Sequence, residues 1–222
     1  MKRADTAVIF DMDGTIFDSE RLVLDCWAKI GEKYGIEGVR DVFIKCIGTN
    51  KARTEEIVFA SYGKDFPYEK FSAESSTLFY ETTKQGGLPV KPGARELIED
   101  LRRKGIPLGL ASSTRLKVVT QELTDAGLYD YFQTVVGGDL IKASKPAPDI
   151  YLMTCERMGV LPENTYAIED SYNGIRSAHA ASLSPVMVPD LLPDTEEMRR
   201  LSKAVFQDLF QVKDWFDALF GK

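Results

Sequence analysis

Two aspartates, Asp11 and Asp13, directly follow a short apolar run at residues 6–10. That run has the length and the β-branched content of a buried strand, and Gly14 and Thr15 add turn residues. The two carboxylates are therefore placed at the exposed end of a strand, with no Lys or Arg beside them in the sequence. Such a pair destabilises a fold unless a cation or a reaction compensates for it. The pair is the first candidate for a chemical site.

The composition narrows the class of protein. The chain has 222 residues, of which 44% are hydrophobic and 28% charged, as in a globular protein with a substantial core. A net charge of −6 argues against nucleic-acid or anionic-membrane partners, which need a basic surface. We find no apolar stretch of about 18 residues and no leader pattern, and the three dispersed cysteines suggest no disulfide framework. We therefore expect a cytoplasmic protein.

Elements that could position the aspartates recur along the chain. From residue 93 onward, apolar runs alternate with amphipathic patterns, which predicts parallel strands joined by right-handed crossovers, an open α/β sheet. Strands are expected at residues 6–10, 106–111, 134–136, 166–168, 185–188 and 204–206. Helices are expected at residues 94–104, 116–126, 149–158, 173–181 and 194–203.

The segment at residues 19–87 has a different pattern. Its apolar residues follow helical spacing without a convincing strand, and it is too long for one crossover helix. We expect an inserted helical domain at 19–87, over the sheet edge where the aspartates emerge. Residues 1–18 plus 88–222 would then form the α/β domain, with a return hinge at 86–89.

Polar residues also follow the later strands. In an open α/β sheet, ligands bind beyond the carboxyl ends of the strands, near the reversal of strand order. The groups at those ends are Ser112, Ser113 and Thr114, then Lys145 with Pro146, and then Glu169 with Asp170. The hydroxyls can begin one helix and offer its first amides to an anion, and we expect the proline to open another. Hydroxyls, helix amides and a lysine suit a phosphoryl group, and carboxylates from two strands suit Mg²⁺.

Each of these residues also has a structural alternative. Ser112 could be a plain helix cap, Lys145 a solvated lysine, and Glu169 with Asp170 a favourable charge at a helix start. Their register along one sheet edge favours a site instead. The combination predicts metal-assisted phosphoryl transfer with a carboxylate nucleophile, and no nucleotide-binding glycine motif is present.

Taken in order, these motifs resemble those of the haloacid dehalogenase-like hydrolases, in particular the branch with β-phosphoglucomutase and its phosphatase relatives. The matching residues are Asp-x-Asp-Gly-Thr at 11–15, Ser112, Lys145–Pro146 and Glu169–Asp170. The likeness covers essentially the whole chain. It implies a Rossmann-like parallel sheet with a helical cap domain at 19–87.

The resemblance also implies roles. Asp11 would be the nucleophile that carries a phosphoaspartate, and Asp13 the general acid and base. Mg²⁺ would be held by the Asp11 side chain, the Asp13 backbone carbonyl and Asp170, with Glu169 a near or direct ligand. Phosphoryl oxygens would be bound by Ser112, Ser113 and Lys145. In the expected cap, a glycine turn followed by cations makes Thr49, Lys51 and Arg53 the candidate substrate residues, and a solvated helix start is the alternative reading of this segment.

The reaction itself is left with alternatives. In β-phosphoglucomutase a cap histidine and a cap arginine stand where this chain has Val23 and Lys51, and lysine does not replace arginine in bidentate phosphate binding. We therefore expect a monomeric phosphatase for a small sugar or sugar-alcohol phosphate. A phosphosugar mutase is the alternative, and a non-catalytic sugar-phosphate-binding regulator is a further one.

Overall fold

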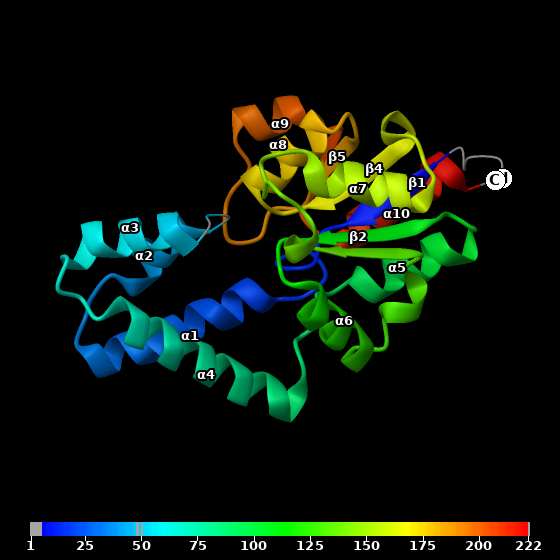
Figure 1. Ribbon diagram of the computed structural model, residues 1–222. Coiled ribbons are helices and arrows are strands. Elements are labelled where there is room, and N and C mark those ends of the chain that lie inside the picture. Colours follow the sequence, from blue (N-terminus) through cyan, green and yellow to red (C-terminus); the bar gives the residue numbers. More distant parts are fainter. Residues whose placement is uncertain (1–5, 48, 50, 222) are drawn as a thin grey trace. The chain divides into compact units, whose positions relative to one another are not determined.

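The computed structural model describes residues 6–47, 49 and 51–221. The chain divides into two compact units, Met1–Asp18 with Pro89–Lys222, and Ser19–Leu88. The first is an α/β unit and the second is built from helices (Figure 1). In the described part of the chain, every helix is too short or too polar to cross a bilayer.

A six-stranded parallel sheet forms the centre of the α/β unit, with strand order β3-β2-β1-β4-β5-β6. Its strands are β1 (Ala7–Phe10), β2 (Leu108–Ser112), β3 (Thr134–Gly137), β4 (Thr165–Glu169), β5 (Ser184–Met187) and β6 (Ala204–Val205). Strand β1 is buried throughout, which explains its uninterrupted apolar sequence. Phe10 pairs with Leu110 of β2 and with Ile168 of β4, so the residues after all three strands emerge at one edge. The predicted open parallel sheet is confirmed.

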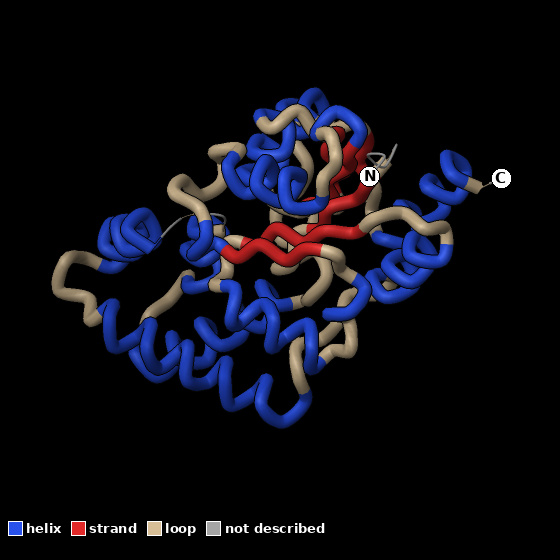
Figure 2. The backbone as a smooth tube through the Cα atoms, turned by 45° about the vertical axis from the view of Figure 1, so that its right-hand side comes forward, coloured by secondary structure: helices blue, strands red, loops and turns tan. Residues whose placement is uncertain are grey.

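Helices cover both faces of this sheet (Figures 1 and 2). Their bounds are α5 (Ala94–Arg103), α6 (Leu116–Asp125), α7 (Asp149–Met158), α8 (Tyr172–Ala180), α9 (Glu196–Leu201) and α10 (Leu209–Phe220). Helices α5 and α6 pack on β2 and β3 from one side, while α7 and α8 lie on the other. The chain thus leaves β1 and β4 toward opposite faces, and the strand order reverses between these two neighbours. A ligand crevice is expected there.

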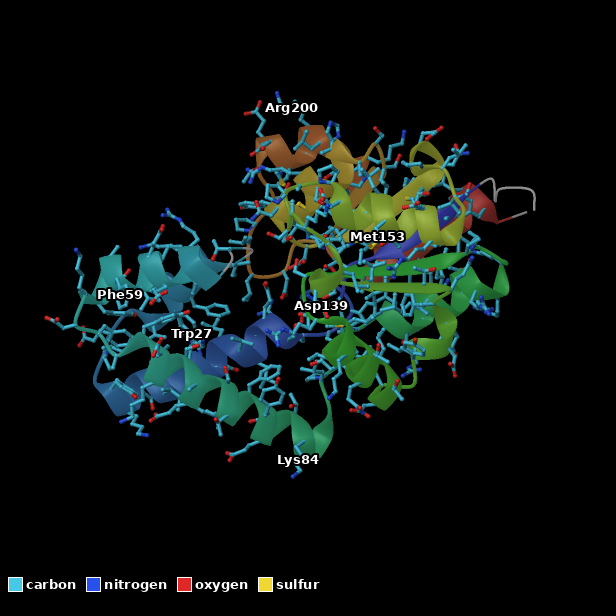
Figure 3. The ribbon with its side chains drawn as sticks, in the orientation of Figure 1. Trp27, Phe59, Lys84, Asp139, Met153 and Arg200 are labelled. Atoms are coloured by element: carbon cyan, nitrogen blue, oxygen red, sulfur yellow. The ribbon has the colours of Figure 1, made fainter. Side chains whose placement is uncertain are left out.

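The helical unit contains α1 (Ser19–Tyr34), α2 (Val39–Cys46), α3 (Lys51–Tyr62) and α4 (Tyr68–Gly86), with α1 packed along α4. Trp27 lies inside this unit (Figure 3). Its ring meets Phe43 and Phe71 edge-on, with centroids 5.2 Å apart in both pairs. Edge-to-face pairs add about 0.5–1.5 kcal/mol to the gain from burial, so this unit has an aromatic core of its own.

Two details expected of helix starts differ in the structure. Helix α7 covers the predicted residues 149–158, but Pro146 does not open it: Pro146 lies three residues before Asp149, and Pro148 is at the N-cap. The helix expected from residue 194 begins instead at Glu196, because the Thr195 side chain accepts a hydrogen bond from Met198 N and caps it there.

Helix α10 was not expected at all. It closes the α/β unit by packing along α5. Trp215 and Phe216 of α10 stand edge-on to Tyr166 of β4, with ring centroids 5.6 and 5.3 Å away. These aromatic contacts, rather than a crossover to a further strand, hold the helix in place.

Candidate active site

Asp11 is the first residue after β1. Its backbone N–H donates to the Ile168 carbonyl at 2.9 Å, which extends the pairing with β4 by one residue and brings Asp11 beside Glu169. Lys145 Nζ lies between the two carboxylates, 2.6 Å from Asp11 Oδ1 and 2.5 Å from Glu169 Oε1. It also donates to the Ala111 carbonyl at 3.1 Å, so all three ammonium hydrogens have acceptors. One cation therefore links the ends of β1, β2 and β4.

Glu169 is fully buried and held by protein donors. The Tyr151 hydroxyl donates to Oε1 at 2.5 Å, and the Ser171 hydroxyl donates to Oε2 at 3.1 Å. A Cβ at position 174 would fall 1.9 Å from this carboxylate, so only glycine lets the start of α8 approach it. Tyr151 was not singled out from the sequence, because no pattern links it to Glu169.

The charges of this cluster compensate one another. Burial raises the pKa of Asp11 well above its usual range, and the neighbouring Glu169 and Asp170 act in the same direction against the opposing Lys145. Burial alone would lower the pKa of Lys145, but Asp11 and Glu169 outweigh it and raise this pKa above its usual value. The lysine therefore stays an ammonium, without which buried carboxylates would cost several kcal/mol each.

Three carboxylates could hold a cation. Asp11, Glu169 and Asp170 are buried and offer oxygens that lie within 4.8 Å of one another. A Cβ at Gly14 would fall 2.2 Å from Asp170 Oδ2, so the turn after β1 packs directly against that carboxylate. Thr15 Oγ1 lies 3.5 Å from Asp170 Oδ1. Oxygen-only donors of this charge fit Mg²⁺.

Asp13 is held differently, by hydroxyl groups that follow β2. Thr114 Oγ1 donates to Asp13 Oδ2 at 2.9 Å, and Ser112 Oγ lies 3.4 Å from the same oxygen. The Thr114 backbone N–H in turn donates to Ser112 Oγ at 3.0 Å. The run of hydroxyls was visible in the sequence, but the contact of Thr114 with Asp13 was not.

The hydroxyl run lies before α6, whose start agrees with the helix predicted at 116–126. Helix α6 starts at Leu116, and the backbone N–H of that residue donates to Asp139 Oδ1 at 2.8 Å. Asp139 is labelled in Figure 3. Ser113 is exposed, and its carbonyl oxygen would lie 2.2 Å from a Cβ at Gly138. Because α6 begins only at Leu116, the Ser112 hydroxyl does not cap its first amides and lies near Asp13 instead.

The candidate residues of the helical unit are engaged within that unit. Thr49 Oγ1 donates to the Cys46 carbonyl at 2.7 Å, and Arg53 pairs with Glu56 at 2.8 Å. The side chain of Lys51 and residues 48 and 50 lie outside the described part of the chain.

Comparisons with known proteins agree with this fold. The family model described as haloacid dehalogenase-like hydrolase matches residues 8–188, and the chain belongs to this family. The phosphorylated carbohydrates phosphatase of Thermotoga maritima is 33% identical over 184 residues, 81% of this chain and 83% of its own length. Hexitol phosphatase B of Escherichia coli K12 is 31% identical, over 82% of this chain and 83% of its own. A Thermotoga maritima crystal structure provisionally described as a β-phosphoglucomutase gives a TM-score of 0.79 at 29% identity, covering 96% and 99% of the two chains.

Proposed function

We propose that this protein is a Mg²⁺-dependent phosphatase that hydrolyses small phosphorylated carbohydrates, as a monomer, through an aspartyl-phosphate. One observation carries the proposal: the Asp11 carboxylate lies at the reversal of strand order, bound by Lys145 and within 4.8 Å of Asp170. A nucleophile, a cation for phosphoryl oxygens and a metal-binding carboxylate then share one point. The phosphorylated carbohydrates phosphatase and hexitol phosphatase B, both relatives of this chain, support the substrate class.

The first step is a displacement at phosphorus. An Asp11 carboxylate oxygen forms a bond to phosphorus while the bond to the ester oxygen breaks. Asp13 gives its proton to the departing alcohol oxygen. In the second step Asp13 takes a proton from water as that water attacks the phosphoaspartate, which releases phosphate and restores both aspartates. At the end of the cycle Asp11 is again a free carboxylate and Asp13 again carries its proton.

Binding of the phosphoryl group falls to the groups around Asp11. Ser112 and the backbone amide of Ser113 would donate to its oxygens. Lys145 would donate too, by exchanging one of its three present acceptors for a phosphoryl oxygen. Mg²⁺ would be held by Asp11, Asp170 and the Asp13 carbonyl and would offset the phosphoryl charge. Glu169 accepts hydrogen bonds from Lys145, Tyr151 and Ser171, so we propose that it holds Lys145 in place. Since a carboxylate oxygen can accept more than one partner, Glu169 stays a near or direct ligand of the metal in this proposal.

The helical unit would act as a cap that selects the substrate. Thr49, Lys51 and Arg53 are the residues proposed to meet the substrate's distal groups. Val23 supplies no proton carrier on α1, which favours hydrolysis over transfer between two phosphate positions. The likeness to the provisionally described β-phosphoglucomutase keeps a phosphosugar mutase as the second candidate.

A screen for phosphate release tests the proposal. The purified protein is incubated with sugar and hexitol phosphates in Mg²⁺, and again with excess chelator. We expect release from at least one such ester and its loss on chelation. Equal turnover in chelator would refute the metal requirement, and binding of the esters without turnover would favour a regulator.

The mutase alternative needs a separate measurement. Phosphorus NMR follows β-glucose 1-phosphate in the presence of the glucose bisphosphate. We expect inorganic phosphate to accumulate. Accumulation of glucose 6-phosphate would overturn the preference for hydrolysis.

A further inference from the structure

A buried ion pair outside the motifs described so far contacts the turn that carries Asp13. Lys91 Nζ lies 2.8 Å from Asp190 Oδ1, and the two side chains are only 15% and 2% exposed. The same Nζ donates to the Gly14 carbonyl at 2.8 Å. Lys91 follows the segment that returns from the helical unit, whereas Asp190 follows β5. The Lys91 ammonium thus links Asp190, from a distant segment, to one peptide group of the turn.

Gly14 is constrained both by its backbone conformation and by its packing against Asp170. Its φ is +76°, a conformation that glycine adopts without strain. Its Cα packs on the Asp170 carboxylate so closely that a Cβ would lie 2.2 Å from an oxygen. A rotation of the peptide groups that flank Gly14 is therefore transmitted to Asp170 through this contact and to Asp13 through the chain.

Both members of the ion pair are themselves fixed. The Lys91 backbone N–H donates to the Ile16 carbonyl at 2.8 Å, so this lysine binds the turn through both its main chain and its side chain. Two residues before Asp190, the Val188 N–H donates to the Glu169 carbonyl at 2.8 Å, which ties the loop after β5 to β4. The pair is consequently anchored to the strand that supplies Asp170.

We propose that Lys91 and Asp190 are positioning residues, which hold the Gly14 carbonyl and thereby fix Asp13 and Asp170 in the geometry that metal binding and proton transfer require. This inference rests on the proposed function. Neither residue touches the substrate in this assignment. A charged hydrogen bond to a carbonyl is stronger than a neutral one, and Asp190 keeps the ammonium aimed at it.

The test compares Lys91→Met with Lys104→Met. Lys104 is a matched control, because it is 20% exposed, pairs with Asp100 and Asp217, and lies at the far end of α5. Mg²⁺ binding is measured by titration calorimetry, and kcat and KM by phosphate release. For Lys91→Met we expect about tenfold weaker Mg²⁺ binding and about tenfold lower kcat with KM unchanged. Lys104→Met should lower Tm while leaving Mg²⁺ binding and kcat at wild-type values.

A milder variant covers the case in which Lys91→Met does not fold. Asp190→Asn keeps the shape and removes the charge, and we expect about threefold weaker Mg²⁺ binding. Wild-type Mg²⁺ binding and kcat in Asp190→Asn, or in a folded Lys91→Met, would overturn this inference and leave the phosphatase proposal intact. A wild-type protein that neither binds Mg²⁺ nor releases phosphate would instead refute the proposed function.

Discussion

The candidate active site has two sides that are built from different chemistry. On the side of the proposed nucleophile, called the nucleophile side below, Asp11 and Glu169 are buried and share the ammonium of Lys145. On the side of the proposed general acid and base, called the acid–base side, Asp13 is half-buried and bound by the hydroxyls of Thr114 and Ser112. The first side is held by charge and the second by neutral groups.

This difference fits the roles proposed for the two aspartates. An ammonium can only donate, so it favours a carboxylate that stays ionised, as a nucleophile must. A hydroxyl can donate to a carboxylate and, after rotating, accept from a carboxylic acid. Thr114 can therefore accompany Asp13 through both protonation states, which a lysine in its place could not do.

The largest expected effect removes the nucleophile. Asp11→Asn should lower kcat by at least about 10⁴-fold, because an amide oxygen is a poor nucleophile at phosphorus. The folded state should persist, since Asn is isosteric and keeps an acceptor for Lys145. Phosphate release and thermal unfolding are measured beside Asp130→Asn, an exposed control. Substantial residual turnover would remove Asp11 from the role of nucleophile.

Next in size is the loss of the cation. Lys145→Met leaves Asp11 and Glu169 without their common partner, and we expect a loss of about 3–5 kcal/mol in the free energy of unfolding. In whatever fraction folds, kcat should fall by about 10²–10³-fold. Denaturant unfolding and turnover are compared with Lys142→Met, an exposed lysine of the same loop. Equal behaviour of the two variants would show that the nucleophile side does not depend on charge.

A smaller effect is expected on the acid–base side. Thr114→Val removes one hydrogen bond to Asp13 at nearly constant shape, worth about 1 kcal/mol, so kcat should fall about five- to tenfold with KM unchanged. Thr114→Ser should restore most of the loss. Thr124→Val, on the exposed face of α6, serves as the control. A normal kcat and pH profile in Thr114→Val would mean that this contact is incidental.

The smallest effect concerns a further carboxyl near the same side. Burial, followed by Asp13 and Asp125, raises the pKa of Glu122 to about 7. In the unfolded chain the pKa of a Glu side chain is about 4.3, so the unfolded state loses this proton first as the pH rises. The free energy of unfolding therefore falls between about pH 4 and pH 7 and stays constant above that range. Glu122→Gln removes that fall and should stabilise the protein by about 1 kcal/mol at pH 8, after allowance for solvent screening, with no gain at pH 4.

Urea unfolding at the two pH values checks this expectation. The exposed Glu156→Gln on α7 should show no such dependence and serves as the control. If Glu122→Gln is as stable as the wild type at both pH values, Glu122 ionises normally and adds no strain to the acid–base side.

The sheet could be predicted because apolar runs alternate with amphipathic segments along the chain, and such alternation indicates parallel strands joined by helices. Parallel strands with crossovers bring every carboxyl end to one edge, so residues as distant as Asp11 and Glu169 could be placed together without a structure. Helix α10 was missed because no strand follows it to imply a crossover. Its place depends on aromatic contacts with Tyr166, which lies far earlier in the chain.

The contacts within the site were less accessible from sequence. Which hydroxyl contacts Asp13 depends on where α6 begins. The N-cap of α6 is Arg115, so the hydroxyls before it are not used to cap the helix. Lys and Asp usually lie on the surface, so nothing in the sequence indicates that Lys91 and Asp190 are buried as a pair. The roles proposed for Asp11, Asp13, Ser112 and Lys145 stay predictions until turnover is measured.

The aromatic cores have a practical consequence for experiments. The chain has two tryptophans, and each unit contains one of them: Trp27 packs among rings of the helical unit, and Trp215 against Tyr166 in the α/β unit. Trp27→Phe would leave a fluorophore that reports only on the α/β unit, and Trp215→Phe one that reports only on the helices. Intrinsic fluorescence can therefore show whether the two units melt together or one after the other.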